Sequence, residues 1–144
     1  MNQTIQDPEL AEIEADIATA MDYCADGEDR RAVVLLERCN QKLRLLSVGQ
    51  HRVEALKLWA LSLAVLEEWE QALLKYEQIL SIDSVDEESL WQASLILLRN
   101  MERPESARAL IADRLLPLNQ LPEYLDALRE CEAALGIERE KSQA

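Results

Sequence analysis

The chain has 144 residues and a net charge of −13, with only three Gly, four Pro and no Phe. Most positions hold strong helix formers such as Ala, Leu, Glu and Arg, so we expect one domain of the all-α class. The negative charge argues against nucleic acid or an anionic membrane as partner, because both attract basic surfaces.

The first half of the chain predicts four helices. Asp7 is the expected N-cap of the first, with Pro8 in its first turn and Gly27 at its end. Apolar residues recur at three-to-four spacing through the segments that follow. These segments predict helices over residues 28–46, 51–67 and 69–82, with a break at 47–50.

The second half predicts three more helices. Ser84 and Glu87 have the spacing of a capping box, which would start a helix that runs to about Asn100. Further helices are expected over residues 104–117 and 122–135, and Gly136 is the expected C-cap of the last. Residues 137–144 are expected to be a frayed tail.

Small residues recur at equivalent positions of successive helix pairs. The first helices carry Ala20, Ala60 and Ser94, and the second helices carry Ala32, Ala72 and Ser106. The spacing is 40 residues from Ala32 to Ala72 and 34 residues from Ala72 to Ser106. Small side chains at such positions allow two helices to cross closely.

The segment of residues 53–86 resembles a tetratricopeptide repeat. It has the helix–turn–helix length of that family, with Ala60, Trp69, Ala72 and Tyr76 at matching positions and the ending "YEQILSIDS". The resemblance implies three repeats, over residues 13–46, 53–86 and 87–120, and a capping helix over 122–135. The implied fold is a single domain of residues 1–144, in which antiparallel helix pairs stack as a short right-handed superhelix. A plain helical bundle is the alternative.

In the tetratricopeptide family, the first helix of each pair lines a concave groove. Carried over to this chain, the groove would be lined by Ile17, Met21, Lys57, Leu61, Val65, Trp91, Leu95 and Arg99. The opposite faces of the third and fifth helices are apolar as well, so we expect the groove to be covered. A partner segment, a second copy of the chain or the 122–135 helix could cover it. Trp91 is the expected anchor, whereas Lys57 alone cannot form the carboxylate clamp of tetratricopeptide co-chaperones.

The sequence offers no convergent catalytic set, so we do not expect an enzyme, a cofactor or a metal site. The single histidine, His51, is expected to be a surface residue at a helix start. The three cysteines, Cys24, Cys39 and Cys131, lack metal-site spacing and are expected to be small buried thiols.

These features predict a cytoplasmic adaptor or chaperone-like protein that binds an apolar or amphipathic segment of another protein. The N-terminus lacks the pattern of a signal peptide, and the apolar run of residues 58–66 is too short to span a membrane. The acidic surface could attract a basic partner. The small acidic chain also resembles bacterial secretion chaperones that hold translocator proteins. The alternative is a structural homo-oligomer that associates through the groove or the C-terminal helix.

Overall fold

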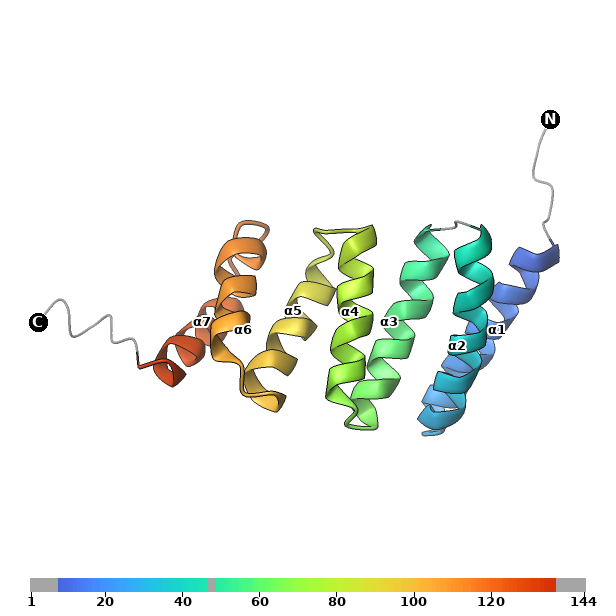
Figure 1. The fold of residues 1–144 in the computed structure, drawn as a ribbon, viewed down its shortest axis with the longest axis horizontal. Coiled ribbons are helices and arrows are strands. Elements are labelled where there is room, and N and C mark those ends of the chain that lie inside the picture. The colour runs from blue at the N-terminus through green and yellow to red at the C-terminus, as the bar shows by residue number, and fades with distance from the viewer. Residues whose placement is uncertain (1–7, 47–48, 137–144) are drawn as a thin grey trace, which may run out of the picture. The chain divides into compact units, whose positions relative to one another are not determined.

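The structure is a computed structural model that describes residues 8–46 and 49–136. All regular structure in these ranges is helical, with seven α-helices, which confirms the all-α class (Figure 1). The chain divides into two compact units, residues 1–75 and 76–144. The predicted Asp7 cap, the tail at 137–144 and part of the break at 47–50 lie outside the described residues. The single domain stays a prediction.

Unit 1 contains three complete helices and the start of a fourth. They are α1 (Pro8–Ala25), α2 (Asp29–Leu46), α3 (Gly49–Val65) and the first half of α4 (Trp69–Ile82). The α1 and α2 helices form an antiparallel pair joined at Gly27 (Figure 1). Gly27 has a φ of 78°, a conformation that glycine adopts at little steric cost. Their shared core is apolar and fully buried at Ile13, Ala20, Ala32, Leu36 and Cys39.

The α3 helix lies beside both α1 and α2, and its core stripe is buried at Leu56, Trp59, Ala60 and Leu63. The Lys75 ammonium of α4 lies 3.8 Å from the centre of the Trp59 ring, a cation–π contact. Trp59 itself is 7% exposed and belongs to the core of unit 1. Ala60 and Ala72 are fully buried too, as their repeat positions predict.

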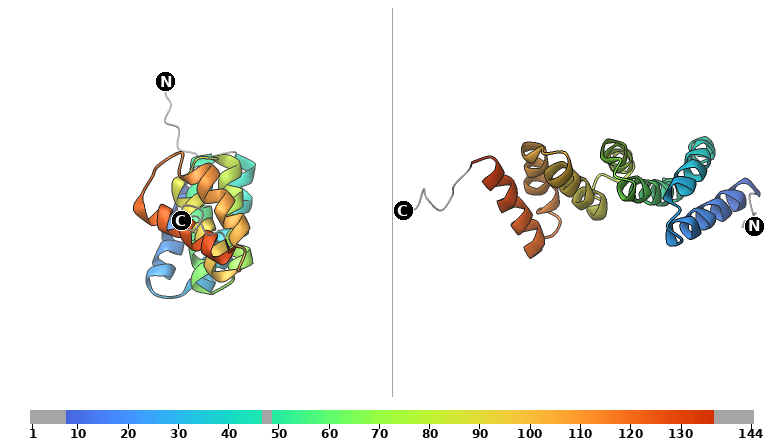
Figure 2. Two further views of the ribbon diagram at one scale, coloured as in Figure 1. Left: turned by 90° about the vertical axis from the view of Figure 1, so that its left-hand side faces the viewer. Right: turned by 90° about the horizontal axis from the view of Figure 1, so that it is seen from below.

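Unit 2 contains the end of α4 and three further helices. They are α5 (Glu87–Leu95), α6 (Pro104–Leu110) and α7 (Pro122–Ala134), and α5 and α6 each continue into a π-helical turn, η1 (Ile96–Asn100) and η2 (Ile111–Leu115). Figure 2 shows α7 beside α6, against which it packs. Gly136 follows α7 with a φ of 77°, as expected for a residue that terminates a helix.

The predicted capping box of Ser84 and Glu87 is wrong. The N-cap of α5 is Asp86, whose carboxylate accepts hydrogen bonds from the backbone N–H of Ser89 at 3.0 Å and from the Ser89 hydroxyl at 2.5 Å. Ser84 lies in the preceding turn, where Asp83 accepts from the N–H of Val85 at 3.2 Å. The carboxylate two residues later is the stronger cap because it is charged and stabilised by the helix dipole.

The buried stripe of the sixth helix lies one residue away from the alignment through Ser106. Ser106 is exposed, and Ala107 is fully buried in its place, together with Ile111 and Leu115 at helical spacing. A stripe through Ser106 would also bury the Asp113 carboxylate, which is unfavourable without a partner. The stripe that starts at Ala107 is apolar throughout, and Asp113 stays exposed.

Candidate functional site: the α1–α3 and α5–α7 faces

The eight residues predicted to line a groove fall into both units. Ile17, Met21, Lys57, Leu61 and Val65 belong to unit 1, and Trp91, Leu95 and Arg99 belong to unit 2.

The α1 and α3 helices lie side by side and run in the same direction. Near their starts, His51 Nε2 lies 2.9 Å from Glu14 Oε2, and near their ends Cys24 Sγ lies 2.9 Å from Ser62 Oγ. His51 was expected at a helix surface, and the structure shows that it also links two helices. These two contacts fix which faces of α1 and α3 meet.

Three exposed apolar side chains flank the contact between Cys24 and Ser62. Met21, Leu61 and Val65 are 57%, 53% and 59% exposed. Met21 precedes Cys24 by one turn of α1 and therefore lies on the face of α1 that meets α3. Val65 follows Ser62 by one turn of α3 and therefore lies on the face of α3 that meets α1. Leu61 precedes Val65 by four residues and lies on the same side of α3. We call Met21, Leu61 and Val65 the α1–α3 face.

The other two predicted groove residues of unit 1 lie beside this face and are less exposed. Ile17 and Lys57 are both half-buried, one turn before Met21 and Leu61 respectively. The α3 helix therefore has one apolar stripe in the core and a second one exposed. An amphipathic surface helix needs only its buried apolar stripe to pack on the core. The exposed apolar stripe of α3 is not explained by that packing.

Acidic residues of α1 lie beside the α1–α3 face. The sequence of α1 contains five carboxylates and no Lys or Arg, but Glu12 pairs with Lys42 of α2 on another side of the helix, and Lys57 of α3 borders the face. Glu14 is engaged by His51, whereas Asp22 is exposed next to Met21. Burial raises the pKa of the Cys24 thiol, so this group stays neutral at pH 7 and adds no further negative charge.

In unit 2, the ring of Trp91 packs against α7. Its centroid lies 4.8 Å from that of Tyr124, with the ring planes tilted by 48°, a favourable arrangement for an aromatic pair. The Tyr124 hydroxyl donates a hydrogen bond to Glu87 Oε2 at 2.5 Å, and the Asn119 amide donates to the same oxygen at 3.2 Å. Burial and the bond to Glu87 raise the pKa of Tyr124 to about 12.

The other predicted residues of unit 2 lie near the same helix or are half-buried. Arg99 Nη2 lies 3.1 Å from Glu130 Oε1 of α7, and Leu95 is half-buried. The α7 helix also packs on α6 and η2, so it contacts the sixth helix as well as two of the predicted groove residues. The sequence left a cap and a cover over the groove as alternatives for this helix, and it did not identify Tyr124 and Glu87 as the residues that attach it. No local pattern marks that pair, because the two residues are 37 positions apart.

Burial raises the pKa of all three cysteine thiols, so each is neutral at pH 7. Cys24, Cys39 and Cys131 are free, and burial raises the pKa of Cys39 to about 11. Across residues 8–46 and 49–136, no three His, Cys, Asp or Glu side chains gather as metal ligands would. Within the same ranges, no helix combines the length and apolarity needed to cross a bilayer.

No protein-family model matches the chain, and no curated protein matches it. The neighbouring exposed apolar side chains of the α1–α3 face are not accounted for by packing within unit 1.

Proposed function

We propose that the chain is a protein-interaction adaptor or chaperone-like protein whose α1–α3 face binds an amphipathic helix of a partner protein. The observation that carries this proposal is the exposure of Met21, Leu61 and Val65 around one contact between two helices. Single exposed apolar residues are ordinary, but neighbouring ones mark interaction surfaces. These side chains are only slightly more than half exposed, so covering each would contribute about 1–2 kcal/mol, roughly half the value for a fully exposed side chain.

The charge of the protein favours a foreign and basic partner over a second copy. Two copies would each carry a net charge of −13 and would repel each other. A helix with an apolar stripe and Lys or Arg on its flanks would meet the apolar face and the carboxylates of α1 together. In this mode of binding, the partner helix presents apolar anchor residues at positions i, i+3 or i+4, and i+7.

The tetratricopeptide resemblance belongs to this proposal. The parallel run of α1 and α3 and the buried small residues Ala20 and Ala60 support it. The proposal places the protein in the cytoplasm and assigns it no catalysis and no cofactor. The secretion-chaperone variant is a narrower form of the same idea, because those proteins also hold apolar segments.

The test is a selection of binding peptides from a random library of 16-residue peptides displayed on phage. The selected peptides are then measured against wild type, Leu61→Glu and Leu74→Glu. Leu74 is a matched control, because it is 46% exposed in unit 1 but lies on α4. We expect peptides with an apolar stripe and basic flanks, which bind wild type and Leu74→Glu but bind Leu61→Glu at least about tenfold more weakly.

Two results would contradict the proposal. One is a selection that enriches no peptide over the Leu61→Glu background. The other is a set of peptides that bind Leu61→Glu as well as wild type. A wild-type protein that forms a concentration-independent dimer, disrupted by Leu61→Glu, would assign the face to self-association instead.

A further inference from the structure

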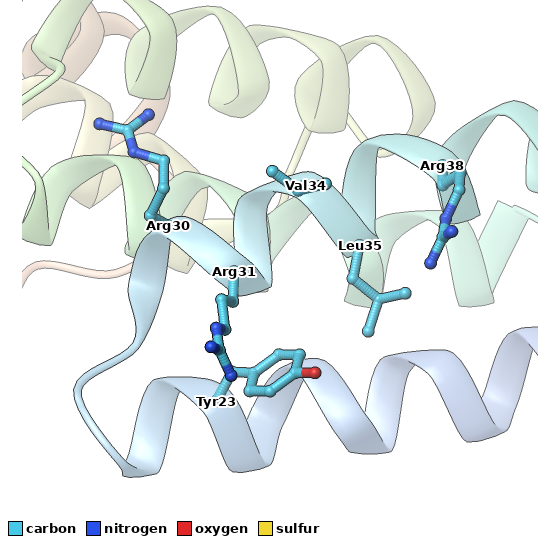
Figure 3. Close-up of a pocket in the computed structure, with 6 residues that line it drawn as sticks. All are labelled: Tyr23, Arg30, Arg31, Val34, Leu35 and Arg38. Carbon is cyan, nitrogen blue, oxygen red and sulfur yellow. The ribbon is translucent and has the colours of Figure 1, made fainter.

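A cavity of about 290 Å³ lies between α1 and α2 in unit 1. It is lined by Tyr23, Arg30, Arg31, Val34, Leu35 and Arg38. Figure 3 shows Arg31, Leu35 and Arg38 extending from α2 toward α1, where Tyr23 lies. These three residues are spaced by four and three positions, so they share one face of α2.

The cavity concentrates positive charge in an acidic protein. Three of its six lining residues are arginines, although the whole chain has a net charge of −13. Arg30 pairs with Glu68, and Arg31 Nε lies 3.3 Å from Glu28 Oε1. Both pairs are solvent-exposed, so they are weak and open to exchange with another anion. Arg38 has no carboxylate partner within residues 8–46 and 49–136 and is exposed.

The position of two of these arginines is unfavourable for the helix itself. Arg30 and Arg31 lie in the first turn of α2, which begins at Asp29. The N-terminal end of a helix carries partial positive charge, so basic residues there destabilise it and an anion stabilises it. Asp29 and the carboxylates paired with Arg30 and Arg31 offset this repulsion in part, and a negatively charged group in the cavity would add to that effect.

The cavity also has an apolar part that a bare anion would not use. Val34 is 58% exposed at its edge, and Leu35 is buried on the side toward α1. The Arg31 guanidinium carbon lies 6.0 Å from the centre of the Tyr23 ring, so the ring supports that cation. A ligand that fills the site needs an apolar group beside its negative charge.

We propose that this cavity binds a short acidic peptide segment in which carboxylates flank a large apolar side chain. The carboxylates would bind Arg31 and Arg38 through the planar, two-pronged geometry that arginine offers. The apolar side chain would contact Val34, Leu35 and Tyr23. A nucleic acid fits less well, because its many phosphates would be repelled by the rest of this acidic surface.

The site is distinct from the α1–α3 face and does not depend on it. Tyr23 follows Met21 by two residues, which places their side chains on nearly opposite sides of α1. Met21 belongs to the side that meets α3, whereas Tyr23 points to α2. One unit could therefore bind a basic amphipathic helix on one side and an acidic segment on the other.

The experiment is an NMR titration of the full chain with a capped synthetic peptide that has two leucines between glutamates. Millimolar peptide concentrations allow weak binding to be seen. We expect saturable shifts at the side-chain N–H groups of Arg31 and Arg38 and at the Tyr23 ring. The Arg38→Gln variant should bind about tenfold more weakly, because one charged hydrogen-bond donor is lost. Arg44→Gln removes the same charge from α2 outside the cavity and should bind as wild type does.

Three control ligands complete the design. A peptide with glutamine for each glutamate, and one with alanine for each leucine, should each bind at least about tenfold more weakly. Inorganic phosphate should not reproduce the shifts at equal concentration. The proposal is overturned if no saturable shift occurs, if Arg38→Gln or either control peptide binds equally well, or if phosphate alone binds as tightly as the peptide. Shifts at Arg38 that grow with protein concentration alone would assign the cavity to an acidic segment of a second copy.

Discussion

The two faces predicted to line one groove differ in how far the chain itself covers them. In unit 1, Met21, Leu61 and Val65 are more than half exposed beside the contact of α1 with α3. In unit 2, Trp91 of α5 packs against Tyr124 of α7. An apolar residue at such a position can therefore be exposed for a partner or be packed within the protein itself. It is packed where a further helix supplies an aromatic side chain to cover it, as Tyr124 covers Trp91.

The largest effect is expected from removing the aromatic residue that attaches α7. Tyr124→Ala deletes a buried ring, its contact with Trp91 and its bond to Glu87. We expect the free energy of unfolding to fall by about 3–5 kcal/mol, as for other buried aromatic residues. Urea unfolding followed by circular dichroism measures this. A loss below about 1 kcal/mol would show that α7 is not held by this residue.

A charge at position 91 should also destabilise unit 2. Trp91→Glu removes the ring that packs on Tyr124 and brings a second carboxylate to the face of α5 that carries Glu87. We expect a loss of about 2–3 kcal/mol in the same unfolding experiment. If Trp91 were instead the exposed groove anchor expected from the sequence, this substitution would leave stability nearly unchanged. If that is what is measured, the contact between Trp91 and Tyr124 contributes little, and Trp91 is available to a partner after all.

A smaller effect is expected from the hydroxyl of Tyr124 alone. Tyr124→Phe keeps the ring but removes one of the hydrogen-bond donors to Glu87. We expect a loss of about 1–2 kcal/mol at neutral pH, because a hydrogen bond to a charged group is lost while Asn119 still donates. Thermal or urea unfolding beside wild type measures it. Equal stability would mean that water replaces the hydroxyl at no cost.

The same pair of proteins tests the pKa of Tyr124. The pKa is raised from its ordinary value of 10.0 to about 12 in the folded chain, so the folded state holds this proton more tightly than the unfolded state. The resulting stabilisation is present below pH 10 and is lost as pH rises from 10 to 12. We expect the difference in stability between wild type and Tyr124→Phe to shrink over that window. A constant difference would contradict the raised pKa.

The smallest effect on stability is expected at the α1–α3 face. Leu61→Glu changes a side chain that is 53% exposed, so the free energy of unfolding should change by no more than about 0.5 kcal/mol. Leu56→Ala in the buried stripe of the same helix is the contrasting control and should cost about 2–5 kcal/mol. A large loss for Leu61→Glu would show that this leucine supports the fold and is not free for a partner.

The sequence predicts the helices well because their signals are local. Pro8, Gly27 and Gly136 mark helix ends through backbone geometry that each residue determines by itself. The expected helix over residues 69–82 coincides with α4 for the same reason. Where two local signals compete, the prediction fails: Asp86 caps α5 in place of Ser84.

The contacts that decide the candidate site are not local, and the sequence did not reveal them. Periodicity shows that α3 and α5 have two apolar stripes each, but it does not show which stripe is covered. The answer in unit 2 depends on Tyr124, which is 33 residues from Trp91. The arginine cavity was missed for a similar reason. Its arginines lie on α2 and resemble ordinary solvated charges in the sequence, and the cavity exists only because Tyr23 of α1 lies opposite them.

The most direct test of the account measures whether the α1–α3 face is bare in the free protein and covered in the complex. Methyl-labelled protein is studied by NMR with a soluble paramagnetic probe, with and without a peptide selected for binding. We predict strong broadening of the Met21, Leu61 and Val65 methyl signals in the free protein and protection when the peptide is bound, while Leu56 stays protected throughout. Two results would contradict the claim that this face binds the partner. One is that the three methyl signals stay equally broadened when the peptide is bound, and the other is that they are already protected in the free protein.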